Sequence, residues 1–386
     1  MTHIKSCDFP ESFKISVSCA SGIESVLKKE IFRLFKVDAP AINGRIEFDG
    51  NPALLTKCNI NLRTADRVYI KTGEFKTETF DELFDAVKSV AWENFIPEDG
   101  NVYVDGKCVK STLFATSDCQ RIVKKAIADR LCEKYGLFRL PENGSTYKVN
   151  FYLFKNTVSF YIDTSGTGLH KRGYRDKVGI APIKETLCSA MLLMSDFYKT
   201  RPFADTFCGS GTFLVESAFI ARNIAPNIGR KFAFNEWKNF DARYYRAALE
   251  EAKDREDFTA HPDIRGFDID KKAVELSLYH ARRAGVGDII KVENIPVKKF
   301  KPWAECGTIV SNPPYGERVY GKEDAERCYR ELGDALRGSP KWSCFIITPH
   351  KGFEKYFGRK CDREKKLYNA EKECRYYFYY PKKETK

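Results

Sequence analysis

Ser311-Asn312-Pro313-Pro314-Tyr315-Gly316-Glu317-Arg318 comes directly after the short β-branched run Gly307–Val310. A run of this composition predicts a buried strand, so we expect the stretch at the point where a strand ends. Open α/β sheets bind their ligands at this carboxyl edge, so the stretch indicates both the class of sheet and the place of its site. The alternative is that Asn-Pro-Pro forms only a stiff turn, since both of its dipeptides favour turns.

The residue types in this turn suit the methylation of an amino group on a nucleobase. Pro313 leaves its carbonyl free and fixes its direction, and the Asn312 side chain supplies a second acceptor. Tyr315 offers a flat ring on which a base can stack. Two acceptors on an exocyclic NH₂ would hold both hydrogens and direct the nitrogen lone pair at an electrophile. Asn312-Pro313-Pro314-Tyr315 resembles the catalytic motif of nucleic-acid methyltransferases that methylate amino groups with S-adenosylmethionine.

A strand, a glycine turn and a helix are predicted upstream of that motif. The strand is Pro202–Phe207, the turn is Cys208-Gly209-Ser210-Gly211, and an apolar helix runs from Thr212 to Ile220. This arrangement binds adenosine cofactors at the helix N-terminus. The dinucleotide fingerprint needs a further glycine at position 214, where this chain has Leu214. The pattern therefore favours a cofactor without a pyrophosphate.

The alternation of strands and helices continues toward the C-terminus. The stretch Ile264–Asp270 predicts a strand that ends in acidic residues, and Asp268 could accept two ribose hydroxyl hydrogens. Asp270 could instead cap the helix predicted over Lys271–Ala284. Ile289–Asn294 predicts the next strand. This half of the chain is expected to form an α/β sheet.

The alternation is interrupted by a segment rich in aromatic residues. We expect residues 222–262 to form an inserted helical excursion that covers the sheet. An aromatic platform for RNA bases is the alternative. The aromatic residues are Phe232, Phe234, Trp237, Phe240, Tyr244 and Tyr245.

The first 165 residues predict a mixed α+β block of short strands and helices. Ser21 and Thr79 each precede a glutamate at the spacing of a capping box, and each is expected to begin a helix. Ser117 is expected to cap a third helix, which stops at Gly136. A hairpin is predicted from the strands Tyr147–Phe154 and Val158–Asp163.

Composition excludes several classes of protein. The 386 residues contain 13 cysteines but no Cys-x-x-Cys pair, and only five histidines. This argues against a zinc site, a disulfide framework and a catalytic metal, and favours reduced thiols in the cytoplasm. The N-terminus lacks the apolar core of a signal peptide, and no apolar run is long enough to span a membrane.

The positive charge is concentrated in the C-terminal half. Residues 1–165 contain 23 Lys and Arg against 22 Asp and Glu, whereas the remainder contains 42 against 31. Such a surplus fits a nucleic-acid partner, although solvated surface lysines explain any single charge as well. The glycine-rich loop 165–175 is either a connector or a phosphate-contacting loop. The candidate RNA contacts are Lys171, Arg172, Arg175 and Arg318.

Several strings of the chain together resemble one family. They occur in the order and spacing of the THUMP-domain RNA methyltransferases, in the bacterial group related to the large-subunit ribosomal RNA guanine-N2 methyltransferases. The similarity covers almost the whole chain. The strings are 205–211, 266–270, 312–318, 62–68, 163–166, 169–175 and 181–185.

The resemblance implies a fold and a division into domains. A Rossmann-like class I methyltransferase sheet would occupy residues 166–386. The α+β part before it would comprise a ferredoxin-like part over residues 1–50 and an RNA-binding THUMP domain over residues 51–165.

The resemblance also assigns roles to individual residues. The catalytic residues would be Asn312, Pro313, Pro314 and Tyr315. Cys208 would pack beside the cofactor rather than act as a nucleophile. The residues expected to bind S-adenosyl-L-methionine are Asp205, Phe207, Cys208, Gly209, Gly211, Asp268, Ile269, Asn294 and Asn312.

The resulting hypothesis is methyl transfer from S-adenosylmethionine to the N2 amine of a guanine in large-subunit ribosomal RNA. Transfer RNA is the alternative substrate, and guanine over adenine rests on the resemblance alone. The rival functions are a DNA or RNA adenine-N6 methyltransferase and a non-catalytic RNA-binding or ribosome-assembly protein. A nicotinamide oxidoreductase is disfavoured by Leu214.

Overall fold

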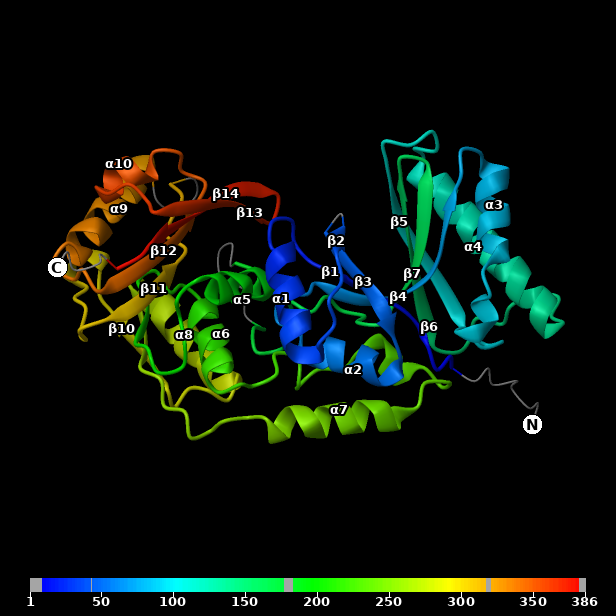
Figure 1. Cartoon of the computed structure of the whole chain (residues 1–386), viewed down its shortest axis with the longest axis horizontal. Coiled ribbons are helices and arrows are strands. Elements are labelled where there is room, and N and C mark those ends of the chain that lie inside the picture. Colours follow the sequence, from blue (N-terminus) through cyan, green and yellow to red (C-terminus); the bar gives the residue numbers. More distant parts are fainter. Residues whose placement is uncertain (1–8, 43, 177–182, 317–320, 382–386) are drawn as a thin grey trace.

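Two seven-stranded sheets organise the chain (Figure 1). The computed structural model describes residues 9–42, 44–176, 183–316 and 321–381. The strand orders are β2-β3-β1-β4-β7-β6-β5 and β10-β9-β8-β11-β12-β14-β13. The first half comprises β1 Phe13–Ser18, α1 Glu24–Phe35, β2 Ala41–Ile42, β3 Arg45–Gly50, α2 Pro52–Asn61, β4 Arg67–Lys76, α3 Phe80–Ser89, β5 Asn101–Val109, α4 Thr116–Tyr135, β6 Thr146–Phe154 and β7 Thr157–Asp163. The second comprises α5 Glu185–Met194, β8 Phe203–Asp205, α6 Thr212–Ala221, α7 Ala242–Asp254, β9 Ile264–Asp268, α8 Lys271–Arg283, β10 Ile290–Asn294, β11 Gly307–Ser311, α9 Lys322–Leu336, β12 Trp342–Thr348, α10 Phe353–Phe357, β13 Arg363–Asn369 and β14 Lys372–Tyr379.

The long strand β4 joins the two parts of the N-terminal sheet. Its ten residues pair with β1 on one side and with β7 on the other, with a bulge between Lys71 and Gly73. The hairpin of β6 and β7 is confirmed.

The first residues of three helices show whether the N-caps predicted from the sequence are correct. Thr79 and Glu82 form the expected capping box of α3. The prediction for Ser21 was wrong, because α1 begins at Glu24, whose carboxylate accepts the N–H of Gly22 at 2.9 Å. Ser117 lies inside the first turn of α4 rather than at its cap. No helix in the described part of the chain combines the length and apolar character needed to cross a bilayer.

The C-terminal sheet is parallel from β10 to β12 and closes with the antiparallel strands β14 and β13. Neighbouring residues of β11 point to opposite faces: Val310 packs with α5, α6 and α8, whereas Ile309 packs with α9 and α10. Helices on both faces bury the sheet, which explains why the strand Gly307–Ser311 is buried throughout. The expected Rossmann-like architecture is confirmed.

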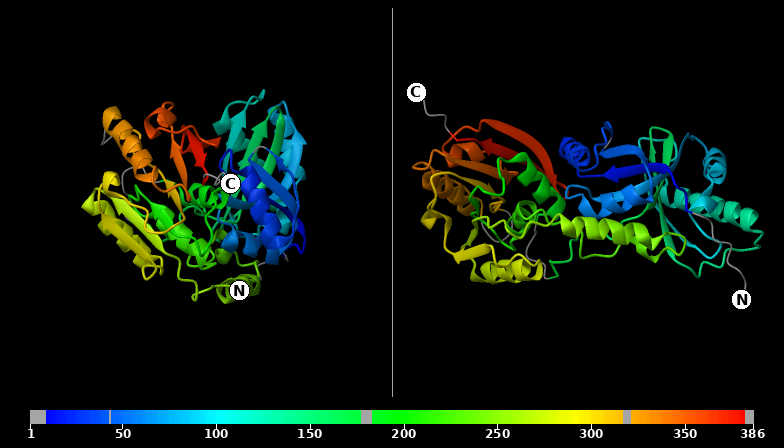
Figure 2. Two further views of the ribbon diagram at one scale, coloured as in Figure 1. Left: turned by 60° about the vertical axis from the view of Figure 1, so that its left-hand side comes forward. Right: turned by 60° about the horizontal axis from the view of Figure 1, so that its bottom comes forward.

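The aromatic segment 222–262 packs against the N-terminal half, so the prediction that it covers the C-terminal sheet was wrong. Trp237 stacks on Tyr147 of β6, with ring centroids 4.9 Å apart. The helix α7 lies beside α2 (Figures 1 and 2), where Lys57 and Glu251 form an ion pair of 2.6 Å. Most of its large aromatic rings are buried in the N-terminal core, so they are not available as a platform for RNA bases.

A buried polar network also links the halves. The guanidinium of Arg63, two residues after the N-terminal helix α2, donates to the carbonyls of Phe219 and Ile224, at 3.3 and 2.7 Å. Arg172 donates to the Arg63 carbonyl and lies 3.5 Å from the buried carboxylate of Glu216. Moving the halves apart would leave buried charges of this network without their partners, which is energetically costly. The network therefore favours one arrangement of the two halves.

Candidate active site

The strand order of the C-terminal sheet reverses between β8 and β11. From β8 the sheet continues through β9 to β10, and from β11 it continues through β12 in the other direction. Such a switch point opens a crevice at the carboxyl ends of the strands. Here Asp205 accepts hydrogen bonds from the Ser311 hydroxyl at 2.7 Å and from the Phe207 N–H at 3.2 Å. The Thr206 N–H donates to the same hydroxyl at 2.9 Å.

Asp205 is a carboxylate in an almost dry position. Its exposed fraction is 1%, and burial raises its pKa to about 7, against the lowering effect of the bonds from Ser311 and Phe207. A buried carboxylate is stabilised in its ionised form by a nearby positive charge. This position therefore suits a ligand that brings a cationic group to the crevice.

The glycine turn between β8 and α6 depends on close backbone approach. Gly211 has a φ of +81°, and a Cβ placed there would lie 3.0–3.1 Å from Ser277 of α8. Gly209, with a φ of +51°, faces open space. Leu214 stands at the position of the third fingerprint glycine, and its side chain packs against Gly266 of β9. A Cβ added to Gly266 would lie only 2.5 Å from the Leu214 side chain. The close contact of helix and sheet is made here by a glycine in the strand.

Asp268 joins this turn to the end of β9. Its carboxylate accepts the N–H of Gly209 and that of Asp270, each at 2.9 Å, and burial raises its pKa. Asp270 caps α8, as predicted. The Asn294 side-chain amide donates to the carbonyls of Asp268 and Ile269, at 3.0 and 2.9 Å. Ile269 is 62% exposed, so its apolar side chain is available at this edge to pack against a flat ring.

These groups fit S-adenosylmethionine, which has no phosphate and carries positive charge. The Asp268 carboxylate can accept ribose hydroxyls, and Ile269 can pack against the adenine. Asp205 can face the cationic part. Cys208 is buried with its thiol near the Ser277 hydroxyl, at 3.7 Å, and burial raises its pKa, so it has the character of a packing residue.

The Asn312–Tyr315 turn follows β11 at the same edge. The Tyr315 hydroxyl donates to the Asn312 side-chain oxygen at 2.6 Å. We expected this oxygen to be open to a target amine and the tyrosine ring to be open to a base. In the structure the two side chains instead contact each other. One of the two lone pairs of the Asn312 oxygen is therefore already used, and a target amine has to use the other or displace the Tyr315 hydroxyl.

Two residues that hold this turn were not predicted. Tyr329 of α9 donates its hydroxyl to the Pro314 carbonyl at 2.9 Å. Asn369, at the end of β13, donates to the Tyr315 hydroxyl at 3.3 Å. No described residue donates to the carbonyl of Pro313. Tyr329 and Asn369 follow the motif by 14 or more positions, so only the fold brings them to it.

The four predicted RNA contacts fall in different environments. Arg172 is 5% exposed and its guanidinium is used by the interior network, so it has no surface to offer a phosphate. Arg175 donates to the Ile183 carbonyl and the Thr212 hydroxyl, both at 3.1 Å, and pairs with Glu185. Lys171 is exposed and remains a candidate. Arg318 lies outside the described residues.

The sheet order and its crevice define a methyltransferase of the Rossmann-like class. Comparison with known protein families narrows the class further. The RMKL-like methyltransferase domain matches residues 172–377, the RlmL ferredoxin-like domain residues 14–69 and the THUMP domain residues 77–163. The chain belongs to this RMKL-like methyltransferase family, and its cofactor is S-adenosylmethionine.

Similar proteins cover nearly the full length. A Bacillus subtilis (strain 168) protein named "Putative RNA methyltransferase YpsC" is 40% identical over 96% of this chain and 97% of its own. The structure titled "Crystal structure of SMU.472, a putative methyltransferase complexed with SAH" has a TM-score of 0.93 and 39% identity over 97% of this chain and 100% of its own. A Listeria monocytogenes structure, titled as a predicted N6-adenine-specific DNA methylase, has a TM-score of 0.92 and 41% identity over 96% and 97%.

Proposed function

We propose that this protein methylates the exocyclic N2 amine of a guanine in large-subunit ribosomal RNA. The observation that carries the proposal is the position of Asn312 and Pro313 at the carboxyl end of β11. The residue before them, Ser311, is hydrogen-bonded to Asp205 at the end of β8. The base-side acceptors and the cofactor-side carboxylate thus lie on neighbouring strands of one crevice.

S-adenosylmethionine supplies an electrophilic methyl group when it is bound. The amine of guanine is a poor nucleophile, because its lone pair is delocalised into the ring. The Asn312 side-chain oxygen and the Pro313 carbonyl would accept the two N–H hydrogens, which favours the positive charge that develops on nitrogen during transfer. One of these protons leaves to water afterwards, and positioning of the base supplies most of the remaining acceleration.

Tyr315 would exchange one partner for another during this cycle. Its hydroxyl occupies Asn312 in the structure and would release it when a base enters. The freed ring can then stack on the base, which must be presented unstacked from a loop or by flipping. Tyr315 would thereby satisfy the Asn312 acceptor between turnovers.

Adenine-N6 methylation is the second candidate. The same acceptors can hold that amine, and the Listeria neighbour of 41% identity is titled as an adenine methylase. The THUMP match favours RNA over DNA as substrate. Transfer RNA and ribosomal RNA are both consistent with a THUMP domain.

The deciding experiment is mass spectrometry of nucleosides from a strain that lacks the gene. Ribosomal and transfer RNA would be analysed separately, before and after incubation with the purified protein and S-adenosylmethionine. We expect N2-methylguanosine to be lost from ribosomal RNA and restored by the protein. Restoration of N6-methyladenosine would establish the second candidate, and a change confined to transfer RNA would correct the substrate. No change in either RNA would contradict the proposed function.

A further inference from the structure

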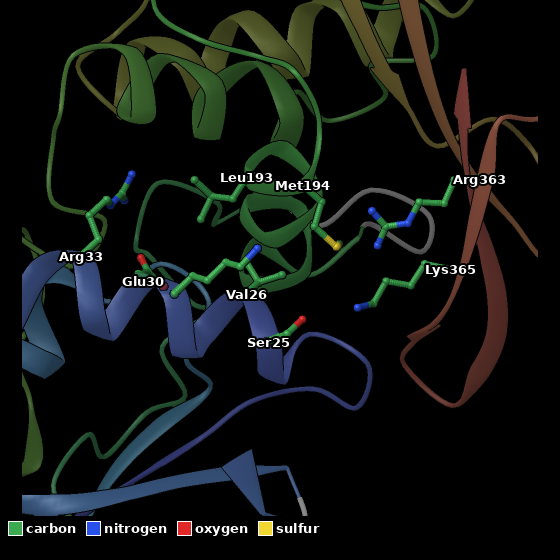
Figure 3. Close-up of a pocket in the computed structure, with 9 residues that line it drawn as sticks. Ser25, Val26, Glu30, Arg33, Leu193, Met194, Arg363 and Lys365 are labelled. Carbon is green, nitrogen blue, oxygen red and sulfur yellow. The ribbon is translucent and has the colours of Figure 1, made fainter. Parts of the chain in front are cut away.

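A basic cleft lies where the N-terminal half meets the last strands of the C-terminal sheet. It has a volume of about 280 Å³ and is lined by α1, the end of α5 and β13 (Figure 3). Four of its lining residues are cations: Lys29 and Arg33 on α1, and Arg363 and Lys365 on β13. Figure 3 shows Arg363 and Lys365 reaching from β13 toward α1.

These four cations have no acidic partner among the described residues. The guanidinium of Arg363 only packs over the Phe378 ring, 4.9 Å from its centroid. The one acidic residue in the cleft is Glu30, which is buried. Both of its carboxylate oxygens are used by the backbone and hydroxyl donors of residues 63–64, at 2.6–3.1 Å. Even with the Glu30 carboxylate counted, the four cations leave the cleft with a surplus of positive charge, in a concave place where such charge attracts anions most strongly.

The cleft is connected to the catalytic turn along one face of β13. Side chains two apart on a strand share a face, so Arg363, Lys365, Leu367 and Asn369 form one row. Leu367 packs in the same core as Ile23 and Val26 at the start of α1. Asn369 ends the row at the Tyr315 hydroxyl. Lys365 and Asn369 are about 13 Å apart along the strand, a span that a few nucleotides can cover.

We propose that this cleft binds backbone phosphates of the substrate RNA on one side of the target nucleotide. The site would be shared by the ferredoxin-like helix α1 and the methyltransferase strand β13. Because the buried network fixes the two halves relative to each other, such a site would hold the strand at a set distance from the Asn312–Tyr315 turn. The assignment depends on the RNA methyltransferase function proposed above, and RNA binding tests it separately from methyl transfer.

Two double variants remove the charges from either wall: Lys29→Gln with Arg33→Gln, and Arg363→Gln with Lys365→Gln. The control is Arg246→Gln with Lys253→Gln on α7, which removes the same charge from exposed residues elsewhere. Affinity for a fluorescein-labelled single-stranded RNA would be measured by anisotropy from 50 to 200 mM salt. Melting temperatures would show that each variant is folded.

Each phosphate contact to a single strand contributes about 0.7 to the slope of log affinity against log salt. We expect each cleft variant to lower that slope by about 1.4 and to weaken RNA binding about tenfold or more at low salt. The α7 variant should keep the native slope. Calorimetric binding of S-adenosylmethionine should be unchanged in all three. In methylation assays on unmodified ribosomal RNA, the cleft variants should raise KM with little change in kcat.

Several outcomes would overturn the assignment. Cleft variants that keep the native slope, or that match the α7 control, would show that the four cations are only solvated surface charges. Native protein that binds no RNA would do the same. If the cleft variants lower the slope of log affinity against log salt while native protein methylates no RNA, RNA binding by the cleft is supported and the proposed reaction is contradicted. If native protein methylates RNA while the cleft variants bind it normally, the reaction stands and the cleft fails.

Discussion

The two sheets of this protein have the same number of strands but offer different chemistry. In the N-terminal sheet most neighbouring strands are antiparallel, and β5 and β6 form its parallel pair. A partly buried ion pair of this sheet, Arg67 with Asp163, anchors the loop after β7 through the Gly166 carbonyl. In the C-terminal sheet, parallel strands bring Asp205, Asp268 and Ser311 to one edge. The difference teaches that strand direction decides where reacting groups can gather. We therefore expect the N-terminal sheet to contribute to RNA binding and the C-terminal sheet to carry out methyl transfer.

The largest effect is expected from Asn312→Ala at the reacting edge. Loss of the side-chain acceptor should slow methyl transfer about 10²-fold or more. Binding of S-adenosylmethionine should fall far less than turnover, although Asn312 is itself among the residues expected to bind it, because Asp205 and Asp268 are untouched. Single-turnover rates and calorimetry with the same preparation separate the two effects. Unchanged turnover would remove the motif from the mechanism.

A matched pair of glycine substitutions sharpens the comparison between the halves. Gly211→Ala places a Cβ about 3 Å from Ser277 at a φ of +81°, which should cost about 1–3 kcal/mol and weaken cofactor binding. Gly136→Ala, in the N-terminal half, has a similar φ of +71° but open space around it, so about 1 kcal/mol of backbone strain is expected. Urea unfolding and cofactor calorimetry measure both. If Gly211→Ala and Gly136→Ala changed cofactor binding equally, the glycine turn between β8 and α6 would have no specific role in that binding.

The pH dependence tests the buried carboxylate of Asp205. Its pKa of about 7 means that ionisation increases between pH 6 and 8, so affinity for the cationic cofactor should rise about tenfold over that range. The folded protein holds this proton at pH values where the unfolded chain has lost it, so the same group lowers stability as pH rises from about 4 to 7. Asp205→Asn should flatten both profiles. Calorimetry and thermal melts at several pH values check this, and identical native and variant profiles would contradict it.

The smallest effect is expected from Tyr315→Phe. Loss of the hydroxyl bond to Asn312 should cost about 1 kcal/mol of stability. Methyl transfer should change less than about tenfold, because the ring remains available to stack. Tyr315→Ala is the comparison, since it also removes stacking worth about 1–3 kcal/mol per base. RNA binding and turnover, measured together, should fall more in Tyr315→Ala than in Tyr315→Phe. Equal losses in the two variants would show that the hydroxyl, and not the ring, is the important group.

Features set by neighbouring residues could be predicted from the sequence. The capping box of Thr79 and Glu82 and the cap at Asp270 involve groups a few residues apart. The glycine turn after β8 and the motif after β11 could be placed because parallel strands share an edge. The position of Asp268 beside Gly209 follows from the same rule.

Features set by distant partners could not be predicted. The aromatic segment 222–262 shows an apolar face, but its spacing does not reveal that the surface it covers belongs to β6 and α2. Arg172 stands in a glycine-rich loop typical of exposed cations, yet Glu216 and the Arg63 carbonyl draw it into the interior. The contacts of Tyr329 and Asn369 with the Asn312–Tyr315 turn depend on the fold in the same way.

The central claim is that the edge shared by β8 and β11 transfers a methyl group to an amine of a base. It is tested most directly by incubating unmodified ribosomal RNA with native protein and tritiated S-adenosylmethionine, followed by digestion and chromatography of the nucleosides. We predict that the label appears in N2-methylguanosine and is nearly absent with Asn312→Ala. Label on a base carbon or a ribose hydroxyl, or full labelling by the variant, would contradict the account.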